Sequence, residues 1–335
     1  MMQFEFRDGI RKPHIQLAVL FATLALALIA NKLFGDPKDP LNALSPLLGL
    51  LVAVEIFWFV TLEVKEGAQK HGWKHEVVDT LVALAVAVMI WFGAQFILST
   101  STPISAVVSC SMLPNLQRGD FVIVQGAPAG AYEIEMSKAE LDSIYSSSSS
   151  ASYGENNVTL EGSLFSYCVT DSKSAMCRAF VMSPESFIEK KGPFTYRYER
   201  CDLRYSNGSQ AYMPCLRSVA FRGTEYLTNL SHDVIVYQPV SGDPYSSIGD
   251  IVHRAFFKID ADGKTYYLTR GDNNPILDLQ VFDYRRGVGN HPVPQESVRG
   301  KVISRIPFLG YFKLFISGFF SEDAQCRTQL SFDHV

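Results

Sequence analysis

The residues best placed to do chemistry lie between two apolar runs, in the serine loop (residues 107–120). Ser109 and Ser111 flank a cysteine, and a Gly-Asp turn at 119–120 follows before the second apolar run at 121–124. This pattern predicts a strand, an exposed turn and another strand. A serine in such a turn stands clear of the backbone, where its hydroxyl could attack a carbonyl group. The alternative is a surface loop without a catalytic role, which is the commoner meaning of an isolated Ser-x-Ser.

A histidine and two aspartates further along the chain could activate this serine. His253 lies between apolar neighbours on a predicted strand, and Asp272 and Asp278 follow a predicted hairpin at 258–268. A neutral imidazole suits the removal of a serine proton near neutral pH, and a carboxylate fixes the imidazole tautomer. The ordinary role of a lone histidine on a strand is in the core. The same histidine and aspartates could instead bind a metal ion, but a metal site leaves the serine loop unexplained.

The serine loop resembles the nucleophile box of type I signal peptidases. The match is Ser-x-Ser-Met-x-Pro-x-Leu at 109–116, followed by the Gly-Asp pair. By this resemblance Ser111 is the nucleophile, and Ser109 lends its hydroxyl to the oxyanion hole. The family usually has glycine where this chain has Cys110.

Two further boxes follow in the order that the family has them. Val-His-Arg-Ala at 252–255 resembles the histidine box of archaeal and endoplasmic-reticulum members, whereas bacterial members use a lysine. Gly-Asp-Asn-Asn at 271–274, with a carboxylate beyond it, is similar to the third box. The resemblance implies that His253 is the general base, that Asp278 is the triad acid and that Asp272 supports the site. An Asx-type turn, in which the side chain binds its own backbone, is the structural role expected of Asp272.

The resemblance implies a mainly antiparallel β catalytic domain and a membrane-bound serine endopeptidase. Such enzymes remove signal peptides from secretory precursors by cutting after small residues at positions −1 and −3. The precursor would pair as an added strand, with Val107 and Val108 lining the shallow pockets. Signal-peptide-bearing precursors, membrane lipid and the translocon are the expected partners, and no cofactor is implied. A net charge of −4 does not indicate nucleic-acid binding.

Two other functions remain open. A bacterial-type Ser-Lys peptidase, or a LexA-like self-cleaving relative, needs a lysine base, for which Lys258 is the nearest candidate. A non-enzymatic surface receptor could use a degenerate peptidase core as the scaffold for a binding module. The presence of the serine, the histidine and the aspartate together argues against that receptor.

The first hundred residues hold the hydrophobic excess of the chain. Three stretches, 15–30, 44–62 and 77–98, approach the roughly 20 apolar residues that cross a hydrocarbon core. Basic residues precede the first stretch and separate the second from the third, which places the amino terminus in the cytoplasm and the serine loop on the far side. Glu55 is expected to bond to a neighbouring helix or to stay protonated. We therefore expect three transmembrane helices within 1–100, with the catalytic domain outside an archaeal cell or in the endoplasmic-reticulum lumen.

The catalytic domain is expected to be interrupted by an insertion. Residues 101–125 and 231–320 form the catalytic β domain, residues 126–230 form an inserted β-rich module, and residues 321–335 form a tail. The change of composition after the second apolar run supports this division. A serine run at 146–150 indicates a flexible tether at the start of the module.

Alternating aromatic, β-branched and polar residues predict strands in the module, around residues 163–169, 178–182, 194–198 and 218–221. A short helix is expected at 136–144. The module has an even number of cysteines, and on the far side of a membrane these predict two disulfides among Cys168, Cys177, Cys201 and Cys215. Three connectivities are open. Glycosylation sequons begin at Asn157, Asn207 and Asn229.

Towards the end of the chain, a last strand is expected at 293–302. Residues 306–316 form an aromatic segment that Lys313 interrupts, and this segment is too short to span a membrane. We expect it to lie in the membrane interface.

Overall fold

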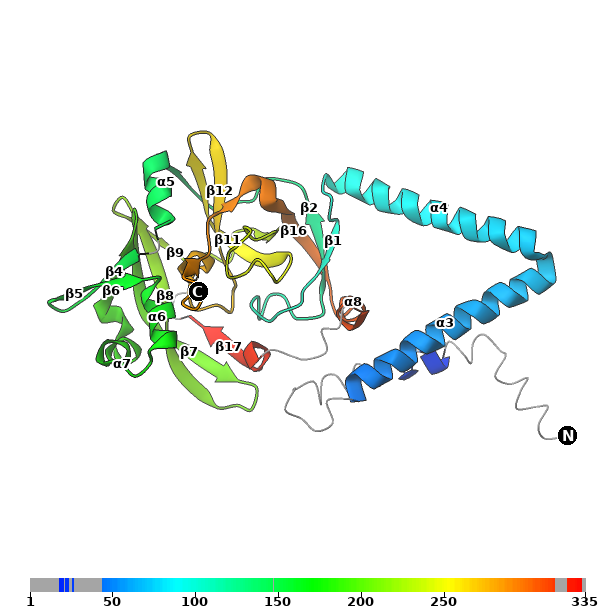
Figure 1. Cartoon of the computed structure of the whole chain (residues 1–335), viewed down its shortest axis with the longest axis horizontal. Helices are drawn as coiled ribbons and strands as arrows, with labels where there is room; N and C mark the ends of the chain where they lie inside the picture. The colour runs from blue at the N-terminus through cyan, green and yellow to red at the C-terminus, as the bar shows by residue number, and fades with distance from the viewer. Residues whose placement is uncertain are drawn as a thin grey trace. The chain divides into compact units, whose positions relative to one another are not determined.

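The computed structural model describes residues 18–20, 22–23, 26, 44–146, 148–316 and 324–332. The chain divides into a helical unit, Met1–Ile97 with Phe308–Glu322, and a β unit, Leu98–Pro307 with Asp323–Val335 (Figure 1). The described residues are mainly antiparallel β-strands, as the sequence predicts.

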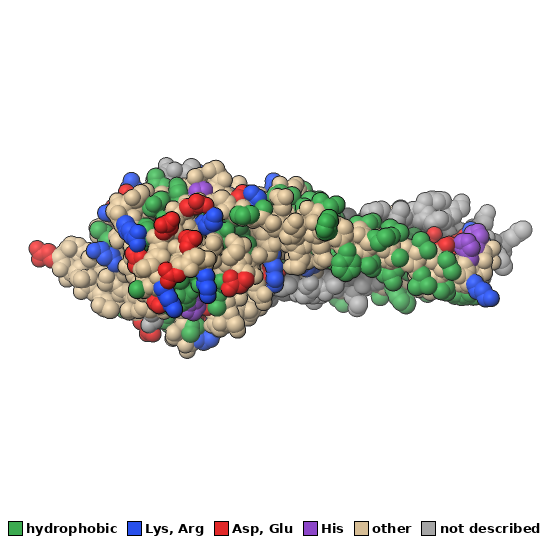
Figure 2. Space-filling view, turned by 90° about the horizontal axis from the view of Figure 1, so that it is seen from above, with side chains coloured by type: hydrophobic (Ala, Val, Ile, Leu, Met, Phe, Trp, Pro, Cys, Tyr) green, Lys and Arg blue, Asp and Glu red, His purple; other side chains and the backbone are tan. Residues whose placement is uncertain are grey.

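The described part of the helical unit consists mostly of two long helices, α3 (Leu44–His71) and α4 (Trp73–Leu98), with the short helix α8 (Tyr311–Ile316). Gly72 separates the long helices with a φ of 85°, a left-handed conformation that glycine adopts without a steric penalty. Within the described residues, one helix is long and apolar enough to cross a membrane, and this is α4. Figure 2 shows hydrophobic side chains along the helical unit.

Two of the three predicted membrane spans lie within these long helices. The stretch at 77–98 lies within α4 and the stretch at 44–62 lies within α3, whereas most of the stretch at 15–30 lies outside the described residues. Thr23 donates a hydrogen bond of 2.5 Å to the Glu55 carboxylate, which confirms the expectation that Glu55 bonds to a neighbouring segment. The location of α8 in a membrane interface stays a prediction.

The β unit contains a first sheet that flanks the serine loop and carries His253. Within the described residues this sheet has eight strands, in the order β1-β2-β16-β10-β11-β12-β15, and β3 pairs in parallel with β11. The strands are β1 (Ile104–Ala106), β2 (Phe121–Gln125), β3 (Tyr132–Met136), β10 (Val234–Tyr237), β11 (Ile251–Ala261), β12 (Lys264–Arg270), β15 (Val293–Pro294) and β16 (Val298–Ile306). The predicted hairpin is therefore the β11–β12 pair, and the two strands that flank the serine loop are β1 and β2.

The register of this sheet places the functional strands at its centre. Ile235 of β10 pairs with His253 of β11, and β16 pairs with both β10 and β2. The side chains of Val122, Val124 and Val236 are fully buried between these strands. The serine loop is closed by two backbone hydrogen bonds, from Val107 to Asp120 and from Gly119 to Val107. The loop is thus anchored at both ends to a packed sheet.

A second sheet of seven strands occupies most of the predicted module. Its order within the described residues is β5-β4-β6-β7-β8-β9, and β17 pairs with β7. The strands are β4 (Ser148–Tyr153), β5 (Asn156–Glu161), β6 (Phe187–Lys191), β7 (Phe194–Tyr205), β8 (Gln210–Phe221), β9 (Thr224–Leu227) and β17 (Thr328–Ser331). A small pair, β13 (Phe282–Asp283) and β14 (Val288–Gly289), lies outside both sheets.

Sheet membership does not follow the predicted domain boundaries at two places. Strand β3 lies within residues 126–230 but pairs with β11 of the first sheet, and β17 lies within residues 321–335 but pairs with β7 of the second. Strand β3 pairs with the part of β11 that β10 does not reach, and β17 pairs with the part of β7 that β6 does not reach. Local composition does not carry this information.

Two predicted strands of the module are helices. Residues 163–169 largely form α6 (Leu164–Thr170), and residues 178–182 end α7 (Ala175–Met182). Each begins at a serine whose hydroxyl accepts from a backbone N–H three residues on, Ser163 from Ser166 and Ser174 from Cys177. These N-caps outweigh the β propensity of the aromatic and branched residues.

The helix predicted at 136–144 is confirmed as α5 (Lys138–Ile144), and a Ser137–Glu140 capping box closes its N-terminus. The predicted tether is wrong, because Ser148, Ser149 and Ser150 of the serine run begin strand β4. Ser149 and Ala151 point inward and are buried, so small side chains fit under the packed aromatic core.

The module contains the two predicted disulfides. Cys168–Cys177 joins α6 to α7, and Cys201–Cys215 joins β7 to β8. This is one of the three connectivities that the sequence leaves open. The two bridges close short loops, with sequence separations of 9 and 14, so each fixes one pair of consecutive elements in the module.

Candidate active site

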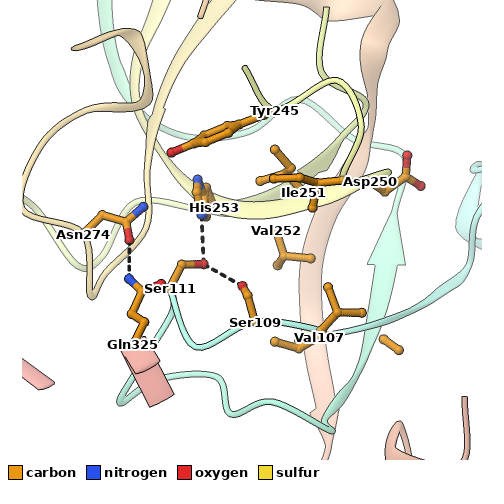
Figure 3. A pocket seen from close by; sticks show the side chains of 13 residues that line it. Val107, Ser109, Ser111, Tyr245, Asp250, Ile251, Val252, His253, Asn274 and Gln325 are labelled. Carbon is orange, nitrogen blue, oxygen red and sulfur yellow. Dashed lines mark hydrogen bonds between the residues drawn. The ribbon is translucent and has the colours of Figure 1, made fainter. Parts of the chain in front are cut away.

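Ser111, His253 and Asp278 form a continuous chain of hydrogen bonds (Figure 3). Ser111 Oγ lies 2.9 Å from His253 Nε2, and His253 Nδ1 lies 2.6 Å from Asp278 Oδ2. A neutral imidazole protonated at Nδ1 would accept from the serine and donate to the carboxylate, which is the arrangement that activates a serine nucleophile. The three side chains come from the serine loop, from β11 and from the 3₁₀ turn Asp278–Gln280. The structure therefore brings together three residues that lie up to 167 positions apart in the sequence.

Two further hydroxyls hold the Asp278 carboxylate. Thr269 Oγ1 donates to Oδ2 at 2.6 Å, and the Tyr237 hydroxyl donates to the same oxygen at 3.1 Å. Burial, together with the nearby negative charge of Asp278, raises the pKa of Tyr237, so the phenol keeps its proton and remains a donor. Asn290 donates to the backbone carbonyl of Asp278 and fixes the turn from the other side. These contacts orient the carboxylate towards His253.

Asp272 does not contact His253. Its two oxygens accept a bidentate pair from Arg254, each bond 2.7 Å long, and Asn115 donates to the same carboxylate. The carboxylate therefore binds side chains of the serine loop and β11, which corrects the expectation of an Asx-type turn. Since this ion pair is largely buried, with side-chain exposures of 11% and 4%, Asp272 holds the second and third boxes together.

We expect Asp272→Asn to act mainly on stability. Removing one partner of a buried ion pair leaves the other charge uncompensated, which costs about 3 kcal/mol. The melting temperature should therefore fall by several degrees, with a smaller loss of turnover than for the residue that binds His253. Thermal unfolding and turnover measured on the same preparation test this. A variant with unchanged melting temperature but no activity would contradict the structural role.

A cleft of about 250 Å³ opens beside Ser111. Val107, Val108 and Ser109 line it from the serine loop, and the Ser109 hydroxyl lies 3.1 Å from that of Ser111. Val107 is buried and Val108 is half-buried, so apolar side chains form part of the serine-loop wall of the cleft. Tyr245 also borders the cleft, with its ring centroid 6.5 Å from that of His253.

The C-terminal segment contributes residues that the sequence analysis missed. Cys110, which precedes the candidate nucleophile, forms a disulfide with Cys326. Gln325 lines the cleft and donates to the Asn274 side chain at 2.8 Å, as Figure 3 shows. Asn273 donates its backbone N–H to the Ser111 carbonyl at 2.7 Å. The count of six cysteines could have revealed the bridge, since four lie in the module and leave this pair.

No protein-family model matches the chain. The chain is 39% identical over 67 residues to the signal peptidase complex catalytic subunit sec11 of Sclerotinia sclerotiorum, covering 20% of this chain and 37% of that subunit. It is 32% identical over 85 residues to the signal peptidase complex catalytic subunit SEC11 of Candida tropicalis, covering 25% of this chain and 46% of that subunit. The chain is signal-peptidase-like over part of its length. The alignments span less than half of each of these fungal subunits.

A longer alignment, at lower identity, is to a protein without a known function. An uncharacterised protein of Methanocaldococcus jannaschii is 21% identical over 220 residues, which cover 64% of this chain and 83% of that protein. This relative carries no functional name. The relationship to signal peptidases therefore comes from the shorter alignments.

In this signal-peptidase-like chain we expect the Cys110–Cys326 bridge to support both stability and activity. Cys326→Ser removes a cross-link between residues 216 positions apart, which should cost about 2 to 4 kcal/mol of stability. The loop before the nucleophile then loses its covalent support, and a small displacement there should lower kcat/KM by roughly 10- to 100-fold.

The matched control is the double variant Cys201→Ser, Cys215→Ser, which removes a bridge inside the module. It should lower the melting temperature without changing kcat/KM. Melting temperature and kcat/KM are measured for Cys326→Ser and for the double variant. Equal kcat/KM in wild type and Cys326→Ser would show that the bridge does not position the nucleophile.

Proposed function

We propose that the chain is a membrane-anchored serine endopeptidase that removes signal peptides from secretory precursors. The observation that carries the proposal is the Ser111–His253–Asp278 hydrogen-bond chain beside a cleft of about 250 Å³. The partial similarity to signal peptidase catalytic subunits and the apolar helix α4 support it. The catalytic β unit would act on the extracytoplasmic side, where a precursor is still tethered to the bilayer.

The chemistry follows from the three side chains. Ser111 Oγ attacks the carbonyl carbon of the scissile bond while His253 Nε2 takes the serine proton. Asp278 stabilises the resulting imidazolium, which then gives its proton to the leaving amine. A water molecule, deprotonated by the same imidazole, hydrolyses the acyl-enzyme and releases the signal peptide. The Ser109 hydroxyl, 3.1 Å from that of Ser111, would donate to the oxygen that becomes negatively charged.

Small residues at −1 and −3 are the side chains that we propose for the part of the cleft that Val107 and Val108 line. Val107 is buried and Val108 half-buried in this wall, so a strand paired alongside would meet apolar side chains there. A precursor with alanine at −1 and −3 should be cut, whereas phenylalanine at −1 should block cleavage. N-terminal sequencing of the mature product in detergent measures both. Cleavage at the phenylalanine variant with unchanged rate would exclude the signal-peptide specificity.

Ser109→Ala is expected to lower kcat by about 10²- to 10³-fold, the usual effect of removing one oxyanion-hole donor. KM should change little, because the hydroxyl acts on the developing charge and not on the ground state. Steady-state kinetics on a purified precursor separate the two parameters. An effect confined to KM would assign Ser109 to substrate binding instead.

The lysine alternative is less well supported. Lys258 donates to Glu133 at 2.8 Å, and this hydrogen bond raises the pKa of Lys258. A general base needs the neutral amine, so the pairing works against that role. Lys258 is also absent from the residues that line the cleft. A receptor with a degenerate core is disfavoured because the serine, histidine and aspartate retain a complete hydrogen-bond chain.

A further inference from the structure

A second cavity of about 310 Å³ adjoins the candidate active site. It shares Tyr245 and Asn274 with the cleft beside Ser111. Figure 3 shows Asn274 on one side of Ser111, and Val107 and Asp250 on the other. The second cavity therefore begins at the side of the nucleophile that lies away from Val107.

The wall of this cavity is mostly apolar and comes from two parts of the chain. Helix α6 of the module supplies Phe165 and Val169, and the segment around the triad acid supplies Ile276 and Phe282. Ile276 and Phe282 are buried, whereas the Val169 side chain is 69% exposed. Such a surface binds apolar side chains, because removing apolar surface from water contributes favourably to the free energy of binding.

Hydrogen bonds fix α6 to the segment that carries Asp278. Ser163 Oγ and Ser166 Oγ both donate to the Gln280 carbonyl, and Phe282 N donates to Ser166 Oγ. Gly162 also packs so closely that an added Cβ would lie 2.6 Å from the Phe282 ring. The cavity is thus built on an element that is held in place relative to the triad.

We infer that this cavity binds an apolar side chain of the substrate on the leaving-group side of the scissile bond. The inference rests on the proposed function, in which the acyl half of the substrate lies along Val107 and Val108. A polypeptide in that position crosses Ser111 and leaves the cleft between Tyr245 and Asn274, at the mouth of the second cavity. The module then takes part in substrate selection through α6.

The test compares two substrates with the same acyl half. One is a peptide series in which a single phenylalanine is moved along the residues after the scissile bond, with glycine at the other positions. The other ends in aminomethylcoumarin and has no residues beyond the bond. With the full-length wild-type protein in detergent, we expect phenylalanine at one position to raise kcat/KM at least about 10-fold over glycine, because one large apolar side chain is buried.

Val169→Lys should remove that preference, so that the kcat/KM ratio of the best peptide to the coumarin substrate falls about 10-fold. The matched control is Val181→Lys, because Val181 is likewise the penultimate residue of a short helix, is 50% exposed and does not line the cavity. The control should keep the wild-type ratio. No preference at any position in the wild type, or a preference that survives in Val169→Lys, would overturn this subsite alone. A wild-type protein that cleaves neither substrate would overturn the proposed function and the subsite with it.

Discussion

Ser111→Ala is expected to lower precursor cleavage by about 10⁶-fold, the scale of effect seen when a serine peptidase loses its nucleophile. The methyl side chain cannot form an acyl-enzyme, and the His253 imidazole loses its hydrogen-bond partner. Since Ser111 makes that bond at the surface of a cleft and its carbonyl bond to Asn273 uses only the backbone, the fold should be retained.

Cleavage by Ser111→Ala is measured with purified precursor, and circular dichroism and the melting temperature report the fold. A variant such as Lys258→Ala, altered at the lysine alternative, serves as the control and should retain activity. If Ser111→Ala cleaves at the wild-type rate, the serine mechanism is wrong. If Lys258→Ala is inactive as well as Ser111→Ala, a Ser-Lys mechanism is favoured over the histidine one.

Asp278→Asn is expected to reduce turnover by up to about 10⁴-fold while the protein stays folded. The amide donates towards His253 Nδ1 and so favours the imidazole tautomer that cannot take the serine proton. His253, Thr269 and Tyr237 all bond to Asp278 Oδ2, and when an amide nitrogen takes that position its second N–H can donate to one of the two hydroxyls, which can accept as well as donate. Asp278→Asn should therefore lower kcat and leave the melting temperature nearly unchanged.

The contrast with Asp272→Asn makes this prediction specific. Asp278 bonds to His253, whereas Asp272 pairs with Arg254, the next residue along β11. Asp278→Asn should thus be stable but nearly inactive, whereas Asp272→Asn should be less stable but more active. Turnover and melting temperature of both variants measure the difference. A stable, inactive Asp272→Asn beside an active Asp278→Asn would reverse the assignment.

Local sequence was sufficient to locate the three boxes, because each consists of neighbouring residues with a distinctive order. The strands around His253 were also predictable, since apolar residues surround it and the Asp-Ala-Asp-Gly turn at 260–263 marks a hairpin. The choice of Asp278 over Asp272 came from the family resemblance, and the hydrogen bond to His253 agrees with it.

The remaining features depend on contacts between distant segments. The aromatic and branched residues of α6 favour a strand by propensity, and only the serine caps and the Gln280 contact favour the helix. The Cys110–Cys326 bridge and the Gln325 contact join positions more than 200 and 50 residues from their partners. Periodicity and composition describe one segment at a time, so they cannot place a C-terminal glutamine beside a loop near residue 110.

Precursor cleavage by the full-length wild-type protein in detergent tests the proposed activity most directly, with Ser111→Ala assayed beside it. The products are identified by intact mass, which gives the position of the cut. We predict two fragments from the wild type, separated after a residue with a small side chain, and uncleaved precursor from Ser111→Ala. A folded wild-type protein that leaves the precursor intact, or the same two fragments from Ser111→Ala, would contradict the assignment of Ser111 as the nucleophile of a signal-peptide endopeptidase.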